Sequence, residues 1–207
     1  MLIPVESWTQ EFVRRLLECF PKQVVFAGLQ GSYRRGEATE KSDIDLVVVL
    51  EEVGLEELRA YRTLVRGMEY GERACGFLCG RSELEGWPRF DLLQLALDTA
   101  PLYGSLDSLV SFTAADLEEA IQVGASALYH AAVHTYLYSP RPEEELAALE
   151  KSLFFLVRLE HYWKSGHYPE TRQESEALLG PQLDAPEERY ARIIRLSSAY
   201  LQTAPNL

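Results

Sequence analysis

The stretch LQGSYRRGEATEKSDIDLVVVL, residues 29–50, joins a Gly-Ser pair at the end of one apolar run to two aspartates inside a second apolar run. In a strand, side chains two residues apart point to the same face, so Asp43 and Asp45 project together while Ile44 and Leu46 pack on the other side. Two carboxylates this close repel each other unless a cation lies between them. Oxygen ligands of this kind suit Mg²⁺ or Mn²⁺, so the sequence predicts a divalent metal site.

A phosphate-binding element is expected nearby, because proteins commonly hold magnesium through one or two carboxylates together with substrate phosphates. Gly31 and Ser32 are the candidates, since a glycine lets the backbone approach a ligand and the free N–H groups of the next turn face an anion. The segment is not a Walker A loop, because Glu37 and Ala38 stand where that motif requires Lys and Ser or Thr. A tight turn followed by a strand with two surface acids would explain each half, but not their occurrence together.

The composition is that of a globular protein with a negative surface. The chain has 207 residues, 47% of them hydrophobic, and a formal net charge of -12. This charge argues against nucleic acid as a partner, because such binding depends on a basic face, and it suits a cationic small molecule better. No apolar run approaches the roughly 20 residues of a membrane helix, so we expect a cytoplasmic protein with no membrane partner. The cysteines and histidines form no zinc or disulfide pattern.

The order of the predicted elements indicates an α+β fold. Three runs have the length and composition of strands: 24–29, 44–50 and 74–79. Residues 90–99 fit a strand or a helix by periodicity alone, and we favour the strand. Beyond about residue 109 only helical patterns remain, the first opening at Thr113 with Asp116 in the capping-box position. We therefore place a mixed-sheet domain at 1–109 and a helical bundle, an all-α domain, at 110–207.

The residues Gly31-Ser32, Arg35-Gly36-Glu37 and Ser42-Asp43-Ile44-Asp45-Leu46, in this order, resemble the signature of the DNA polymerase β-type nucleotidyltransferase superfamily, in its small antibiotic-modifying and minimal branches. The resemblance implies that the Gly-Ser turn holds the β- and γ-phosphates of an NTP such as ATP, and that Asp43 and Asp45 ligate Mg²⁺. It further implies transfer of a nucleoside monophosphate to an acceptor hydroxyl. Ser42 joins the nucleotide-binding candidates, whereas Arg35 either neutralises phosphate, pairs with Glu37 or lies on a helix surface.

Catalytic members of the superfamily usually carry a third carboxylate on a neighbouring strand. The stretch WPRFDLLQLALDT, residues 87–99, is similar to the part of aminoglycoside adenylyltransferases in which an acid begins an apolar strand. This similarity makes Asp91 the expected third metal ligand and base. Asp98 is the runner-up and Glu83 the remaining candidate. The alternative for each of the three is a helix cap or a solvated turn residue, and for Asp98, just before Thr99 and Pro101, this alternative has nearly equal weight.

The helical half resembles two kinds of domain. The first is the acceptor-binding wall of kanamycin nucleotidyltransferase-like enzymes, in which aromatic side chains stack on a ring or sugar: here Tyr129, Tyr136, Tyr138, Tyr162, Trp163 and Tyr168. The second is the HEPN-type domain found beside minimal nucleotidyltransferases. Nuclease activity is disfavoured, because Arg158 lies too close to His161 and too far from His167 for the Arg-x4-6-His motif of that group.

Two functions follow from these features. The first is an Mg²⁺-dependent nucleotidyltransferase that acts on a hydroxyl of an aminoglycoside-like small molecule or of a protein. The alternative is a non-catalytic nucleotide-binding module with a regulatory or antitoxin-like role. The acceptor, the preferred NTP and the oligomeric state, a homodimer included, are left open by the sequence.

Overall fold

The computed structural model describes residues 2–203, which fall into two compact units. Unit 1 holds the described residues up to Pro88 together with Leu95–Ser111, and unit 2 holds Arg89–Gln94 together with the described residues from Phe112 onward. The division after Ser111 lies near the boundary expected at residue 109. The six residues Arg89–Gln94 differ from expectation, because they belong to the helical unit although they precede that boundary in the chain.

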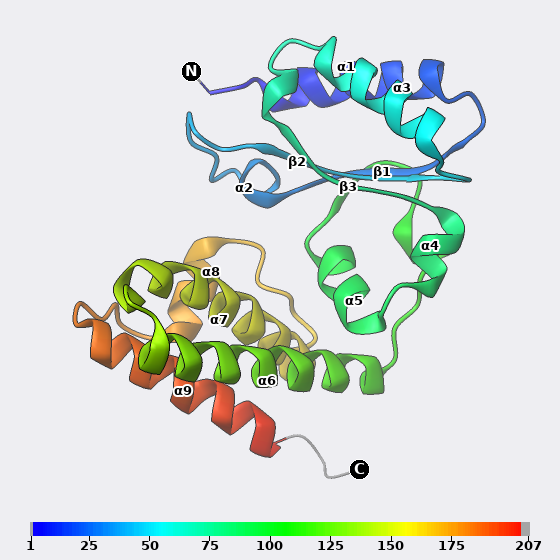
Figure 1. The fold of residues 1–207 in the computed structure, drawn as a ribbon. Helices are drawn as coiled ribbons and strands as arrows, with labels where there is room; N and C mark the ends of the chain where they lie inside the picture. Colours follow the sequence, from blue (N-terminus) through cyan, green and yellow to red (C-terminus); the bar gives the residue numbers. More distant parts are fainter. Residues whose placement is uncertain (1, 204–207) are drawn as a thin grey trace. The chain divides into compact units, whose positions relative to one another are not determined.

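Unit 1 is built on a four-stranded mixed sheet with the order β3-β2-β1-β4. Strand β1 pairs antiparallel with both β2 and β4, whereas β2 and β3 run parallel. Helices α1 and α3 lie side by side over one face of the sheet (Figure 1). The elements of this part of the chain are α1 (Val5–Cys19), β1 (Val24–Gln30), α2 (Gly31–Arg34), β2 (Ile44–Leu50), α3 (Leu55–Arg66), β3 (Ala74–Gly80), α4 (Arg81–Gly86), α5 (Arg89–Leu97) and β4 (Ala100–Tyr103), with single 3-10 turns at Gly71–Arg73 and Leu106–Ser108.

The alternation along β2 separates a core face from the face that carries the acids. Ile44, Leu46, Val48 and Leu50 are fully buried in one cluster with α1 residues such as Phe12. Because neighbouring strand residues point to opposite faces, Asp45 lies on the face away from that cluster. The predicted packing of Ile44 and Leu46 is confirmed. Val47 and Val49 are also fully buried, as expected of an inner strand covered on both faces.

The predicted strand at residues 90–99 is wrong. Residues Arg89–Leu97 form helix α5, and the strand that follows, β4, begins only at Ala100. The segment consists largely of Leu, Ala, Gln and Arg, which are strong helix formers, and it contains no β-branched residue before Thr99. Its alternation of apolar residues imitates a strand, but Leu92 and Leu93 are buried next to each other on the helix. Asp91 therefore stands in the first turn of a helix.

Unit 2 is helical apart from its loops. Helix α6 packs against both α7 and α9, and α7 also contacts α8 and α9. The predicted capping box at the start of α6 is confirmed, because the Thr113 amide donates to Asp116 (2.7 Å) and the Asp116 amide donates to the Thr113 hydroxyl (3.2 Å). No helix within residues 2–203 is long and apolar enough to cross a membrane. The helices of this unit are α6 (Ala114–Tyr138), α7 (Pro142–Ser165), α8 (Arg172–Leu179) and α9 (Pro186–Thr203).

An arginine is fully buried in unit 2. The Arg158 guanidinium donates from Nε (2.9 Å) and Nη2 (2.6 Å) to the Pro169 carbonyl and lies 4.2 Å from the centre of the Tyr168 ring. Removing one partner of a buried charge is costly, so these contacts tie the loop after α7 to the helix. Arg158 therefore has a structural explanation.

Gly76 in β3 gives a test of the sheet. Its φ is +136°, and a Cβ there would lie 1.9 Å from the Leu46 carbonyl oxygen. Since backbone atoms of β2 cannot move aside, we expect Gly76→Ala to lower the free energy of unfolding by about 3 kcal/mol. Gly86→Ala is the control, because a Cβ on Gly86 meets nothing within 4 Å. Urea unfolding followed by circular dichroism measures both; equal stability of the two variants would contradict the close approach of β3 to β2.

Candidate active site

The Gly-Ser turn and the acidic pair meet at one edge of the sheet, the edge formed by the end of β1 and the start of β2. Because β1 and β2 are antiparallel, the end of β1 lies beside the start of β2, and Gln30 is paired with Asp45. Helix α2 begins at the next residue, Gly31, and Asp43 immediately precedes β2. The antiparallel register therefore brings together two features that are separated in the sequence, as the interpretation of the 29–50 stretch required.

Gly31 is in direct contact with the Asp45 carboxylate. Gly31 has a φ of +69°, and a Cβ there would lie 2.0 Å from Asp45 Oδ2 and 2.9 Å from Cγ. The carboxylate thus packs onto the Cα of Gly31, in space that any side chain would fill. Glycine is required here twice over, once for the backbone angle and once for the close approach. Asp45 is half-buried by this contact, whereas Asp43 is exposed.

Two other predicted residues shape the turn and the loop that lead to Asp43. Ser32 is half-buried, and its carbonyl accepts a hydrogen bond from the Glu37 amide (2.8 Å), which closes the turn after Gly31. The Ser42 hydroxyl accepts from the Thr39 amide (2.9 Å). Arg73, which the sequence reasoning missed, donates from Nη2 to the Ser42 carbonyl and also to the Thr39 carbonyl (3.5 Å). These bonds hold the loop whose next residue is Asp43.

Arg35 is paired with acids in two loop segments of unit 1. Its Nε donates to Glu37 Oε2 (3.0 Å), and its Nη1 donates to Asp98 Oδ2 (3.3 Å). The neighbouring Arg34 approaches the same carboxylate, with Nη1 3.9 Å from Asp98 Oδ1. The predicted pairing of Arg35 with Glu37 is therefore present, and Asp98 adds a partner that the sequence did not indicate.

The expected third carboxylate is not supplied by a neighbouring strand. Asp91 is exposed on helix α5 and belongs to unit 2, so the strand on which its assignment rested does not exist. Strand β3, which lies beside β2, carries no acid, and Cys75 is the residue paired with Asp45. Asp98 does lie at the same sheet edge, since the next strand, β4, begins beside Leu29, but its carboxylate faces the two arginines.

Glu83 lies at the wrong edge of the sheet for the acidic pair. Strand β3 runs parallel to β2 and ends at Gly80, opposite Leu50, so helix α4 with Glu83 follows the far end of the strand. Burial, together with the nearby charge of Glu83, raises the pKa of the Cys79 thiol to about 11. Glu83 thus influences the far end of β3 and is excluded from the site at Asp45.

The donor chemistry fits a magnesium ion that is completed by substrate. Within residues 2–203, neither unit contains three His, Cys, Asp or Glu side chains grouped so that they could hold a metal alone. Mg²⁺ is usually bound by one or two carboxylates, several waters and substrate phosphates. Asp43 and Asp45, beside a turn that allows close backbone approach, match this kind of incomplete site and not a protein-only cage.

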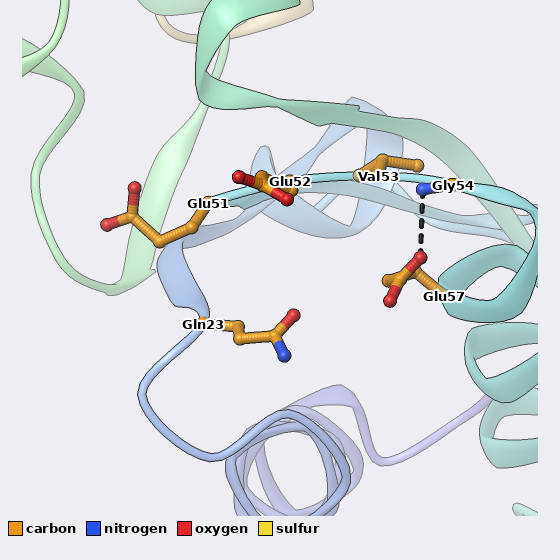
Figure 2. Close-up of a pocket in the computed structure, with 6 residues that line it drawn as sticks. All are labelled: Gln23, Glu51, Glu52, Val53, Gly54 and Glu57. Atoms are coloured by element: carbon orange, nitrogen blue, oxygen red, sulfur yellow. Dashed lines mark hydrogen bonds between the residues drawn. The ribbon is translucent and has the colours of Figure 1, made fainter.

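An acidic pocket of about 480 Å³ lies at the opposite edge of the sheet (Figure 2). Gln23 precedes β1 and Glu51 follows β2, so the pocket is at the ends of these strands that lie away from Gly31 and Asp45. One of its acids is engaged in a helix cap, because Glu57 Oε2 accepts from the Gly54 amide (2.9 Å). The pocket is therefore separate from the candidate site. It is lined by Gln23, Glu51, Glu52, Val53, Gly54 and Glu57.

Comparisons with known proteins agree with this geometry. Residues 9–75 match the family model described as a nucleotidyltransferase domain, a span that includes the Gly-Ser turn and both aspartates. Among solved structures, the fold is similar to that of the spectinomycin adenyltransferase AAD(9) from Enterococcus faecialis, solved with ATP and spectinomycin, with a TM-score of 0.53, 14% identity and coverage of 94% of this chain and 98% of that one. A search of curated protein sequences found no match.

The match of residues 9–75 to a nucleotidyltransferase domain supports the predicted superfamily and a transferase enzyme, and the shared fold confirms the predicted α+β class. At 14% identity, the similarity to the solved structure shows the fold of the chain. The residues matched by the family model, 9–75, end before α5, and the solved structure shows the fold alone. Neither comparison therefore bears on the role of Asp91 or Asp98.

The contact between Gly31 and Asp45 can be tested with a matched pair of glycines. Gly31 and Gly36 have nearly equal φ, +69° and +70°, but a Cβ on Gly36 meets nothing within 4 Å. We expect Gly31→Ala to lower the free energy of unfolding by about 1–3 kcal/mol more than Gly36→Ala, because only Gly31→Ala adds a clash to the strain. Adding Asp45→Ala to the Gly31 variant should remove this difference. If the difference persisted in urea unfolding, the carboxylate would not occupy the space above Gly31.

Proposed function

We propose that this nucleotidyltransferase transfers a nucleoside monophosphate from Mg²⁺-ATP to a hydroxyl group of an acceptor that is a cationic, aminoglycoside-like small molecule or a protein. The observation that carries the proposal is the packing of the Asp45 carboxylate onto Gly31 at the end of β1. A phosphate held by the turn would thereby lie beside the acids that share its metal. A turn and a pair of surface acids with unrelated roles would not require this contact.

The residues of unit 1 have distinct parts in the proposed reaction. The backbone at Gly31 and Ser32 receives the β- and γ-phosphates, because consecutive N–H groups at a turn form an anion-binding concavity. Asp43 and Asp45 supply carboxylate oxygens for the metal. A divalent ion bound there would neutralise the phosphate charge and polarise the phosphorus centre. Arg73 and Ser42 act on this arrangement by fixing the loop that carries Asp43.

The chemical step is a substitution at the α-phosphorus. The acceptor oxygen forms a bond to this atom, the bond from the α-phosphorus to the bridging oxygen breaks, and pyrophosphate leaves with that electron pair. The acceptor proton passes to a base. Such transfers depend on positioning and charge neutralisation more than on covalent help, which agrees with a site made of a turn, two acids and arginines.

The net charge of -12 supports a cationic acceptor, because a negative surface raises the local concentration of positively charged molecules. Exposed aromatic side chains of unit 2 are available to stack on such a molecule or on its sugars. Tyr168 is not one of them, since it is buried against Arg158. Among the residues of unit 2 that the structure describes, the exposed tyrosines are Tyr129, Tyr136 and Tyr138 on α6.

The metal pair is tested by replacing both acids. Asp43→Asn combined with Asp45→Asn keeps the side-chain shape and removes both charges, so we expect Mg²⁺-dependent ATP binding to fall by at least about 100-fold while the protein stays folded. Calorimetry with and without Mg²⁺ measures this. The control is Glu51→Gln, which removes an acid at the opposite sheet edge. Unchanged Mg²⁺-ATP affinity in the double variant would overturn the site assignment.

Asp91 remains the predicted base and is tested separately. Incubation of the protein with Mg²⁺, α-labelled ATP and pooled aminoglycosides, lincosamides and candidate proteins identifies the acceptor. With that acceptor, Asp91→Asn should preserve ATP binding and lower transfer by about 100-fold or more, the usual range for loss of a general base. Full transfer by the variant would remove Asp91 from the mechanism. ATP binding without any transfer by the unmodified protein would favour the regulatory module over the transferase.

A further inference from the structure

Asp98 is a buried acid that the proposed reaction does not use. Its side chain is only 10% exposed, and those of Arg34 and Arg35 are 14% exposed. All three residues belong to unit 1. Arg35 Nη1 lies 3.3 Å from Asp98 Oδ2, and Arg34 Nη1 lies 3.9 Å from Oδ1. One carboxylate therefore faces two consecutive arginines, each oxygen toward a different guanidinium group.

The backbone around Asp98 is fixed to the end of β1. The Gln30 side chain donates from Nε2 to the Thr99 hydroxyl (2.7 Å) and to the Leu95 carbonyl (3.1 Å). The Thr99 methyl group fills the space above Gly28, where a Cβ would lie 2.3 Å from it. Because Gln30 directly precedes Gly31, the same residue that leads into the turn also holds the segment carrying Asp98.

The two guanidinium groups retain capacity for a further anion. Each arginine has five N–H donors in a planar fork that matches carboxylate and phosphate oxygens. Arg34 Nε is buried and has no hydrogen-bond partner among the described residues. Arg35 sits at the C-terminal end of the turn, and its amide donates to the Gly31 carbonyl (3.3 Å). The cations are thus built into the same turn that begins at Gly31.

We propose that Asp98 is a positioning residue that holds Arg34 and Arg35 in the orientation in which they receive the terminal phosphates of the nucleotide. This inference rests on the proposed function, since it assigns a role toward the triphosphate of the same site. Two adjacent arginines repel each other, and a single carboxylate between them compensates both charges. The buried carboxylate thereby keeps two long side chains ordered before the phosphates arrive, which reduces the entropy lost on binding.

The experiment measures binding of Mg²⁺-tripolyphosphate, Mg²⁺-ATP and AMP by calorimetry to the unmodified protein and to Asp98→Asn. We expect about tenfold weaker binding of tripolyphosphate and ATP, the loss of about one charge-assisted hydrogen bond, with AMP affinity unchanged. In transfer assays the KM for ATP should rise about tenfold while kcat stays within about twofold. Glu51→Gln is the matched control, because it breaks an ion pair with Arg81 (2.8 Å) at the other sheet edge and should change none of these values.

A set of arginine variants distinguishes positioning from a direct role. If Asp98 acts through the arginines, adding Asp98→Asn to the double variant Arg34→Gln, Arg35→Gln should cause no further loss of tripolyphosphate affinity. If Asp98→Asn alone fails to fold, the single variants Arg34→Gln and Arg35→Gln keep the inference testable, because each leaves one arginine facing the Asp98 carboxylate. Each should weaken tripolyphosphate binding, and unchanged binding by both would overturn the proposal. A further loss in the triple variant would overturn the proposal. Loss of kcat with an unchanged KM would also overturn it, since Asp98 would then act as a base.

The outcomes separate this inference from the proposed function. Tripolyphosphate binding that depends on Asp98, in a protein that transfers no nucleotide to any acceptor, would support the inference and remove the transferase. Transfer activity with equal tripolyphosphate binding by the unmodified protein and Asp98→Asn would overturn the inference alone. If the unmodified protein bound neither tripolyphosphate nor ATP, both would be overturned.

Discussion

The antiparallel register of β1 and β2 is the constraint on which the site depends. Pairing of Gln30 with Asp45 places the start of the Gly31 turn beside the acidic end of β2. A slip of one residue would turn Asp45 toward the face where Ile44 and Leu46 are buried, and would expose those side chains. The burial of the apolar face of β2 therefore fixes the acids as firmly as it fixes the core, and the Gly31 contact follows from the same register.

Strand β1 also separates two kinds of charge. On its β2 side lie Asp43 and Asp45, which are proposed to bind a cation, and on its β4 side Asp98 faces two arginines of the α2 turn. A magnesium triphosphate matches both charges, because its cation can bind the acids and its phosphate oxygens can bind the guanidinium groups. Under the proposals above, this division gives the two consecutive arginines of the turn a role toward the triphosphate. The Gly31 turn lies between the two sides, so a triphosphate bound there would lie near both the acids and the arginines.

Much of the sheet could be predicted from sequence, because period-two alternation fixes strand faces and the spacing from Gly31 to Asp45 is local. The third acid could not, since its place depends on strand direction and partner choice, which are set by long-range pairing. Glu83 was a candidate until the parallel pairing of β3 placed it at the far edge. Arg73 was missed for a related reason: it donates to backbone carbonyls, and no sequence pattern marks a carbonyl as a partner. The helix at Arg89–Leu97 was mistaken because its apolar residues alternate while its composition favours a helix.

The topology also limits where the proton acceptor of the proposed reaction can come from. An acid carried by a strand can join the pair only if that strand begins or ends at the same sheet edge. Strand β3 begins there with Ala74 and Cys75, and the segment before β4 contributes Asp98, which is engaged by arginines. If Asp43 and Asp45 bind the metal as proposed, the strands that the structure describes offer no further carboxylate for the acceptor. Under the proposed function, the nucleotide would be bound by the turn, acids and arginines of unit 1, and the base would come from outside the strands of the sheet; Asp91, on helix α5, is the predicted one.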